Sequence, residues 1–286
     1  MVGVEAVLVV EAEVSAVLAV AAPEAEAPAA VGDRLKVKRA SMVPQQQIDD
    51  FIKRLREAAG ENLRSVILYG SAASGEFHPE FSNVNLLCIL RETSFVALTA
   101  IASAVKWWTR QKHRPPLFLT RDELEHSTDV FSIEYLDMQQ RHKVLFGDDV
   151  VSGLSIPMHF HRAQLEYELR EKLILLREQL IVSANDTKAL WKLMLGSVST
   201  FATLFRHALI VAGVPVPASK REAIQTLASR FQFDPAVFQQ LFDIRERRSD
   251  PKQFDCREVF SKYLLAIEHV TAAVDKMLDS EENGRN

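Results

Sequence analysis

Short apolar runs alternate with amphipathic segments between residues 46 and 146 of this 286-residue chain. Apolar runs bounded by Gly, Pro or Asn are typical of buried strands, and apolar residues that recur every three or four positions are typical of helices. The predicted helices are 46–59, 71–75, 93–113 and 121–126, and the predicted strands are 64–69, 83–90, 117–120, 130–137 and 143–146. This order predicts an α/β or α+β domain built on a mixed sheet.

Strand signals end near residue 158, and the rest of the chain shows only the helical spacing. The predicted helices cover 162–182, 187–212, 220–230, 235–247 and 259–278. A chain of this length with 48% hydrophobic residues can bury one or two cores. We therefore expect a tail at residues 1–45, a sheet domain at 46–157 and an all-α helical bundle at 158–282.

The N-terminal tail is rich in Ala, Val, Glu and Pro and has no basic residue in positions 1–30. Glu5, Glu11 and Glu13 interrupt its apolar runs, so it lacks the charged start and continuous core of a signal peptide or membrane span. We expect a disordered or weakly helical tail. Met42 is an alternative start of the protein, and in that case the residues before it carry no function.

A candidate phosphate site lies where the strand 64–69 ends in Gly70-Ser71. Glycine allows a tight turn, and the backbone N–H groups at the start of the next short helix can bind an anion. Gly70, Ser71 and Ser74 are the candidate nucleotide-binding residues. The other interpretation is an ordinary strand-to-helix turn.

Two amides follow in the next predicted strand. Asn83 and Asn85 are two residues apart, so a strand would place both side chains on one face and Val84 on the other. They are candidate ligands or, alternatively, ordinary turn and strand-edge amides.

The Gly70-Ser71 turn, followed about a dozen residues later by this strand, resembles the nucleotidyltransferase superfamily of DNA polymerase beta and kanamycin nucleotidyltransferase. The resemblance implies a nucleoside triphosphate such as ATP as ligand or substrate and Mg²⁺ as cofactor, with an Asp-x-Asp pair holding the metal. Here Asn83 and Asn85 stand at the aspartate positions. Family members often carry Arg in the turn, where this chain has Ala72, Ala73 and Ser74.

The resemblance also implies a third acidic residue on a later strand. Glu134, in the predicted strand 130–137, is our choice, and Asp137 is the alternative. By resemblance Glu134 would be a metal ligand or the general base, so the implied catalytic set is Asn83, Asn85 and Glu134. A solvated strand face is the competing interpretation for Glu134.

The two amides predict weak metal binding and a low rate of nucleotide transfer. An amide offers a hard cation one neutral oxygen, whereas a carboxylate offers a full negative charge. If each lost charge costs roughly 2–3 kcal/mol, the pair lowers the rate by about three to four orders of magnitude. We expect a catalytically weakened or inactive nucleotidyltransferase-like protein that can bind nucleotide. The alternatives are an active transferase that moves NMP to a small-molecule or protein hydroxyl, and an interaction module without nucleotide.

Charge and cysteine content limit the partners. The net charge of −4 does not favour nucleic acid, and the two basic clusters are predicted to be solvated helix faces: Lys106, Arg110, Lys112, His113 and Arg114, and Arg245, Arg247 and Arg248. Two cysteines, Cys88 and Cys256, imply no disulfide framework. We expect a cytoplasmic protein without a membrane partner, whose helical domain can pair with a second copy.

Overall fold

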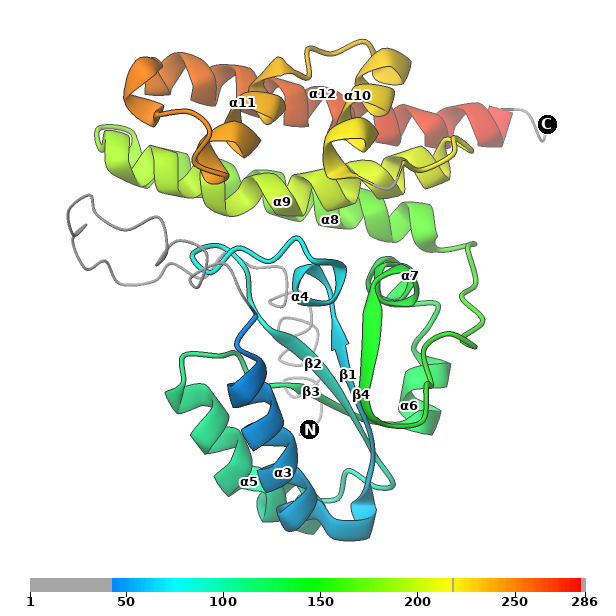
Figure 1. Cartoon of the computed structure of the whole chain (residues 1–286). Coiled ribbons are helices and arrows are strands. Elements are labelled where there is room, and N and C mark those ends of the chain that lie inside the picture. Colours follow the sequence, from blue (N-terminus) through cyan, green and yellow to red (C-terminus); the bar gives the residue numbers. More distant parts are fainter. Residues whose placement is uncertain (1–42, 218, 284–286) are drawn as a thin grey trace, which may run out of the picture. The chain divides into compact units, whose positions relative to one another are not determined.

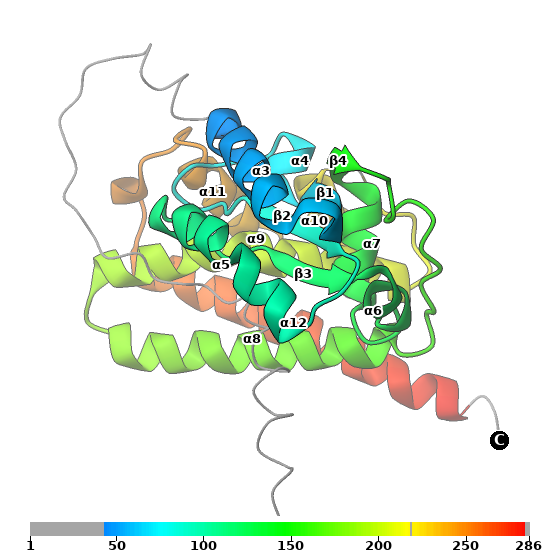
Figure 2. The ribbon, with the colours of Figure 1, turned by 90° about the horizontal axis from the view of Figure 1, so that it is seen from below.

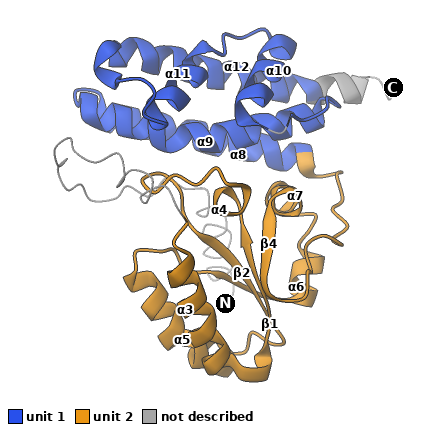
Figure 3. Ribbon diagram, viewed as in Figure 1, with its two compact units in different colours: residues 1–27, 162–286 blue, residues 28–161 orange. Residues whose placement is uncertain are grey.

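A computed structural model describes residues 43–217 and 219–283 of the chain. These residues form two compact units that divide between His161 and Arg162 (Figure 3). We call them the sheet unit and the helical unit and describe each by itself. The predicted tail, up to residue 42, lies outside the described residues.

The sheet unit contains a mixed sheet of four strands in the order β3-β2-β1-β4 (Figure 1). The strands are β1 (Leu63–Tyr69), β2 (Asn85–Leu90), β3 (Leu117–Thr120) and β4 (His142–Gly147). Central β1 runs antiparallel to β2 and β4, and β3 runs parallel to β2. The expected mixed sheet is therefore present, with β1 ending at the candidate turn.

Side-chain alternation along β1 and β2 builds one core on each face of the sheet. Val66 and Leu68 face a core shared with α3 (Gln45–Ala59) and α5 (Phe95–Arg110), and Ile67 and Tyr69 face the core that includes α6 (Arg121–His126) and α7 (Ser132–Gln140). Figure 2 shows α3 and α5 on the same face of the sheet. The sheet is thus covered on both faces, which explains the nearly continuous apolar runs of β1 and β2.

The two adjacent tryptophans of α5 lie on different faces of the helix and differ in burial. Trp108 is fully buried, with its ring 4.9 Å from Phe51 and 4.0 Å from His113. Trp107 is only partly buried, and the Arg54 guanidinium lies 4.7 Å above its ring. Adjacent residues of a helix cannot share one face, so one ring packs in the core while the other is partly exposed.

One predicted strand is wrong. Residues 130–137 were expected to be extended, but Ser132–Gln140 forms helix α7. Ile133 and Tyr135 alternate with polar residues and favour a strand by propensity. Helix α7 nevertheless buries Ser132, Ile133, Tyr135 and Met138, so packing against the sheet overrides the local preference.

The helical unit contains α9 (Thr187–Val211), α10 (Lys220–Phe231), α11 (Ala236–Arg245), α12 (Cys256–Asn283) and α8 (His161–Ser183) after its first residue. Aromatic rings fill its core: Phe201 lies 5.9 Å and Phe238 5.3 Å from Tyr263, whose hydroxyl is 2.9 Å from Ser197 Oγ. Helix α9 is long and apolar enough to cross a membrane by length and composition, but 61% of that stretch is buried. Its hydropathy is therefore explained by its place in the core.

Candidate functional site

The candidate site begins at the carboxyl end of β1, where Gly70 turns the chain into the short helix α4 (Ser71–Ser74). Gly70 has φ +73° and ψ −148°, a conformation that only glycine adopts readily. A β-carbon on Gly70 would lie 3.2 Å from the Asn85 side-chain nitrogen. The turn therefore depends on glycine for its backbone conformation and for its close approach to Asn85.

Hydrogen bonds hold this turn in place. The Gly70 N–H donates to the Arg141 carbonyl over 3.2 Å, and the Gly70 carbonyl accepts from Ala73 and Ser74. The Ser74 hydroxyl donates to the Ser71 carbonyl over 3.3 Å. All three predicted nucleotide-binding residues thus take part in local structural bonds, Ser71 through its carbonyl alone. The groups best placed for an anion are the Ser71 hydroxyl and the N–H groups of Ser71 and Ala72, since those of Ala73 and Ser74 already donate to the Gly70 carbonyl.

We expect Gly70→Ala to lower the free energy of unfolding of the sheet unit by about 2 kcal/mol, because alanine is strained in this region of the Ramachandran plot. Gly75→Ala is the matched control. Gly75 has a left-handed φ of +78°, and an added β-carbon would meet nothing within 4 Å, so this change should cost only about 1 kcal/mol. Urea titration followed by Trp107 and Trp108 fluorescence, in a Trp191→Phe background, measures both. Equal losses would contradict a special conformation at Gly70.

Asn85 lies beside the turn, whereas Asn83 lies outside the strand. Asn85 pairs with Tyr69 at the start of β2 and is half-buried. Asn83 is exposed and precedes β2, so the predicted strand start at residue 83 is two residues too early. Val84 is buried in the core shared with α3 and α5, as expected from alternation. Only Asn85 is held by the sheet next to Gly70.

Glu134 lies on helix α7 and not on a strand, which corrects its predicted setting. Burial raises the pKa of the Tyr69 hydroxyl strongly, and the nearby charge of Glu134 raises that pKa further. Tyr69 is the last residue of β1, directly before Gly70. The charge of Glu134 therefore acts on the Tyr69 hydroxyl at the end of β1, although Glu134 belongs to a helix and not to a strand. Asp137, the alternative, lies three residues further along α7.

Arg141 is a residue at this turn that the sequence reasoning missed. Its carbonyl accepts the Gly70 N–H, and its guanidinium lies 3.0 Å from a carboxylate oxygen of Glu76, two residues after α4. The side chain of Arg141 is only 14% exposed. A cation therefore borders the turn even though the turn itself contains none. The link between residues 70 and 141 is made by strand pairing, and no local pattern indicates it.

A second polar cluster fixes the strand on the other side of β1. His142 pairs with Tyr69 and lies with its Nε2 3.2 Å from Asp149. The Ser152 hydroxyl donates to Asp149 over 2.6 Å, and this bond, together with N–H groups of residues 151 and 152, holds the pKa of Asp149 well below its usual range. These bonds anchor the loop after β4.

The donors at the site do not fit a two-metal centre. Asn83 and Asn85 can each offer one neutral oxygen, and neither β3 nor β4 contains an acidic residue. In the described part of the chain, no group of three His, Cys, Asp or Glu side chains is placed to hold a metal ion. Two divalent ions need several carboxylate oxygens to offset their charge. The residues present therefore do not support a metal pair.

Comparison with known proteins agrees with this fold. Residues 48–139 match the family model described as a nucleotidyltransferase domain. Among solved structures, spectinomycin adenyltransferase AAD(9) from Enterococcus faecialis, crystallised with ATP and spectinomycin, is similar with a TM-score of 0.50 and 13% identity. The similarity covers 82% of this chain and 100% of that one. The search of curated sequences finds no relative. At this identity the structural likeness shows the fold alone.

Proposed function

We propose that the nucleotidyltransferase domain of this chain, residues 48–139, binds a nucleoside triphosphate at the Gly70-Ser71 turn but transfers nucleotide weakly or not at all. The Ser71 hydroxyl and the N–H groups at the start of α4 would contact phosphate oxygens. Arg141 borders the same turn, where its guanidinium pairs with Glu76, so the phosphates would compete with Glu76 for this cation. The similar adenyltransferase was crystallised with ATP, which makes ATP the first nucleotide to test.

The observation that carries this proposal is the amide of Asn85 against Gly70. Tyr69 pairs with Asn85, and a β-carbon on Gly70 would lie 3.2 Å from the Asn85 side-chain nitrogen, so residue 85 lies beside the Gly70-Ser71 turn. A neutral side chain at this position preserves the shape of the site but supplies no charge to a metal ion. Phosphate binding by backbone groups needs no such charge. Binding and catalysis are therefore separable in this site.

A charge placed in the turn tests where the nucleotide binds. Ser71→Glu puts a carboxylate where the phosphates would lie, so we expect ATP affinity to fall at least about tenfold, which is about 1.4 kcal/mol. Ser103→Glu, on an exposed position of α5, adds the same charge elsewhere in the sheet unit and should change affinity little. Competition against a fluorescent ATP analogue measures both. If both variants bind ATP like the parent protein, the turn is not the nucleotide site.

The second candidate function is an active, metal-dependent transferase of NMP to a hydroxyl. Glu134 favours it, since its charge acts on the hydroxyl of Tyr69, the last residue of β1, and it would then be the main acidic group. Spectinomycin, named with the similar adenyltransferase, is one acceptor to try. Steady release of pyrophosphate from ATP that stops with Glu134→Gln would support this function over the first.

A further inference from the structure

Strand β3 is an open edge of the sheet. It pairs with β2 on one side and is the outer strand of the described sheet on the other. All four of its residues are only partly buried, whereas β1 and β2 are buried almost throughout. Outside the β2 ladder, residues 117–119 form no backbone hydrogen bond within the part of the chain that the structure describes. An edge of this kind can pair with a strand of another chain.

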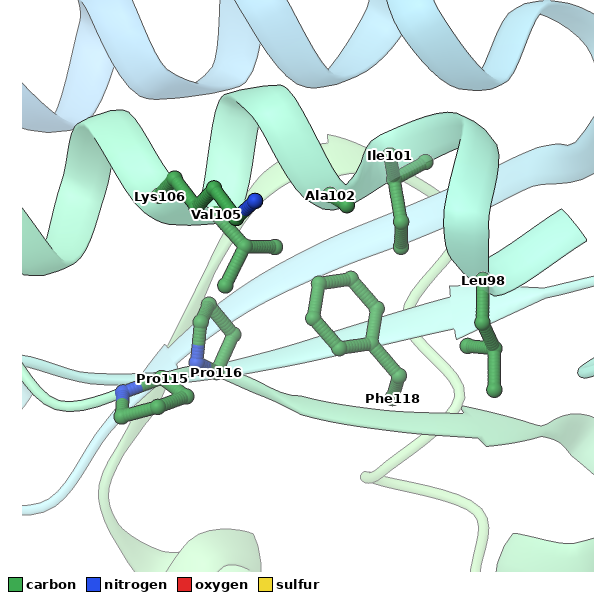
Figure 4. Close-up of a pocket in the computed structure, with 8 residues that line it drawn as sticks. All are labelled: Leu98, Ile101, Ala102, Val105, Lys106, Pro115, Pro116 and Phe118. Carbon is green, nitrogen blue, oxygen red and sulfur yellow. The ribbon is translucent and has the colours of Figure 1, made fainter. Parts of the chain in front are cut away.

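Apolar side chains flank this edge on the α5 side. A groove of about 350 Å³ lies between α5 and β3. Figure 4 shows the Phe118 ring in the groove, with Lys106 toward one end and Leu98 toward the other. Phe95 and Val96, at the start of α5, are 82% and 75% exposed. Exposed apolar residues beside an open strand edge mark an interaction surface.

The end of this surface that precedes β3 is positively charged. Trp108 Nε1 donates to the Arg114 carbonyl over 2.8 Å, which places the last turn of α5 next to the start of β3. Helix α5 contains no acidic residue, and Lys106, Arg110 and Lys112 are exposed. None of these three cations forms an ion pair with another described residue. Their charge is therefore available to an acidic partner.

The end that follows β3 is negatively charged. Helix α6 begins directly after β3 and presents three exposed acidic residues: Asp122, Glu123 and Glu125. The Thr93 hydroxyl donates to Glu123 over 3.2 Å, so the start of α5 is at this end too. Arg121 pairs with Glu125 at an exposed position, where such a pair contributes little. One arginine against three acidic residues leaves α6 with a net charge of −2 when His126 is neutral.

A twofold axis would bring these two ends together. In an antiparallel pair of identical strands, the start of each strand lies beside the end of the other. The cations beside the start of β3 in each copy would then face the acidic α6 of the other, twice in one pair.

The apolar pattern of β3 sets the register of such a pair. Phe118 faces the core of α3 and α5, whereas Leu117 and Leu119 face the core of α6 and α7. With Phe118 opposite Phe118 of the second copy, Leu117 lies opposite Leu119 of that copy, and like faces meet. A shift of one residue would oppose unlike faces.

We propose that two copies of this chain pair through β3, antiparallel and with Phe118 opposite Phe118, and so join their sheets into one. Lys106 and Lys112 of each copy face Asp122 and Glu125 of the other. Pro116 has no N–H to donate, so the ladder is confined to β3 and the dimer should dissociate on dilution. The sheet unit would thus make the contact that the sequence analysis expected from the helical domain.

Two charge-reversal variants of the full chain test the pairing of the ends. Lys106→Glu with Lys112→Glu makes both ends acidic, and Asp122→Lys with Glu125→Lys makes both ends basic. Each variant alone should dimerise at least about tenfold more weakly than the parent in sedimentation velocity, because like charges then meet at both contacts. An equimolar mixture of the two should regain the parent affinity as a mixed dimer.

The matched control changes the same charge away from both ends. Lys143→Glu with Lys252→Glu, at exposed positions of β4 and of the helical unit, should dimerise like the parent. Failure of the mixture of reversed variants to dimerise would contradict the assigned pairing of the ends.

Hydrogen exchange identifies the strand that makes the contact. We expect the amides of residues 117–119 to exchange at least about tenfold more slowly in the concentrated parent than in the diluted parent or in either reversed variant. The amides of β4, the opposite outer strand, should not respond to dilution.

A parent chain that stays monomeric over about a hundredfold range of concentration would overturn the proposal. A dimer that tolerates both charge reversals, or that leaves residues 117–119 unprotected, would overturn it as well and would favour pairing through the helical unit.

Discussion

Introducing two carboxylates, with Asn83→Asp and Asn85→Asp, should raise the metal-dependent release of pyrophosphate from ATP by about three orders of magnitude. Two added charges would offset the charge of bound divalent ions, and each restored interaction of roughly 2–3 kcal/mol corresponds to about one and a half to two orders of magnitude in rate. The assay compares the parent, both single variants and the double variant in Mg²⁺ and in Mn²⁺. The increase should disappear in chelator.

The two single variants should differ in their rate of pyrophosphate release. Asn85 pairs with Tyr69 beside Gly70, whereas Asn83 is exposed and precedes the strand. Asn85→Asp should therefore give the larger increase in rate. Asn185→Asp, a change of the same charge in the helical unit, is the control and should have no effect. A double variant that binds ATP but releases pyrophosphate no faster than the parent would show that the amides do not limit the chemistry.

Gly147→Ala should destabilise the sheet unit more than any other glycine substitution described above, by about 4 kcal/mol. Gly147 has φ +74°, and a β-carbon on it would lie 1.8 Å from the Arg64 carbonyl oxygen. That oxygen belongs to β1, whose Ser65 pairs with Gly147. Relief of the clash must separate β4 from β1, and the Arg141 carbonyl that holds the Gly70 turn directly precedes β4.

The matched control is Gly153→Ala, whose added carbon would meet nothing within 4 Å. This variant should stay within about 0.5 kcal/mol of the parent. Urea unfolding in the Trp191→Phe background reports on the sheet unit through Trp107 and Trp108. Similar unfolding of the two variants would contradict the close approach of β4 to β1.

Much of the fold follows from local patterns in the sequence. Strands β1, β3 and β4 and helices α3, α5 and α9 lie within a few residues of their predicted bounds, because each has a continuous apolar run or a clear helical spacing. Helix α7 was missed because Phe131, Ile133 and Tyr135 alternate like a strand. Its helical state is set by burial against the sheet.

The candidate site was only partly predictable. Gly70 and Ser71 indicate the turn because glycine is required there, and the structure gives Gly70 the positive φ that explains it. Arg141 and the approach of Glu134 to Tyr69 depend on strand pairing and on helix packing across about seventy residues of sequence. Contacts between residues so far apart in the sequence produce no short-range pattern from which they could be predicted.

Calorimetric titration of the full chain with ATP and with GTP, each in Mg²⁺, in Mn²⁺ and in chelator, tests the central proposal most directly. A site that binds phosphate through the Gly70-Ser71 turn without metal carboxylates should show saturable binding that changes less than about tenfold between Mg²⁺ and chelator, or about 1.4 kcal/mol. Binding that requires the metal would contradict a weakened metal site and favour the active transferase. No heat with either nucleotide would contradict nucleotide binding itself.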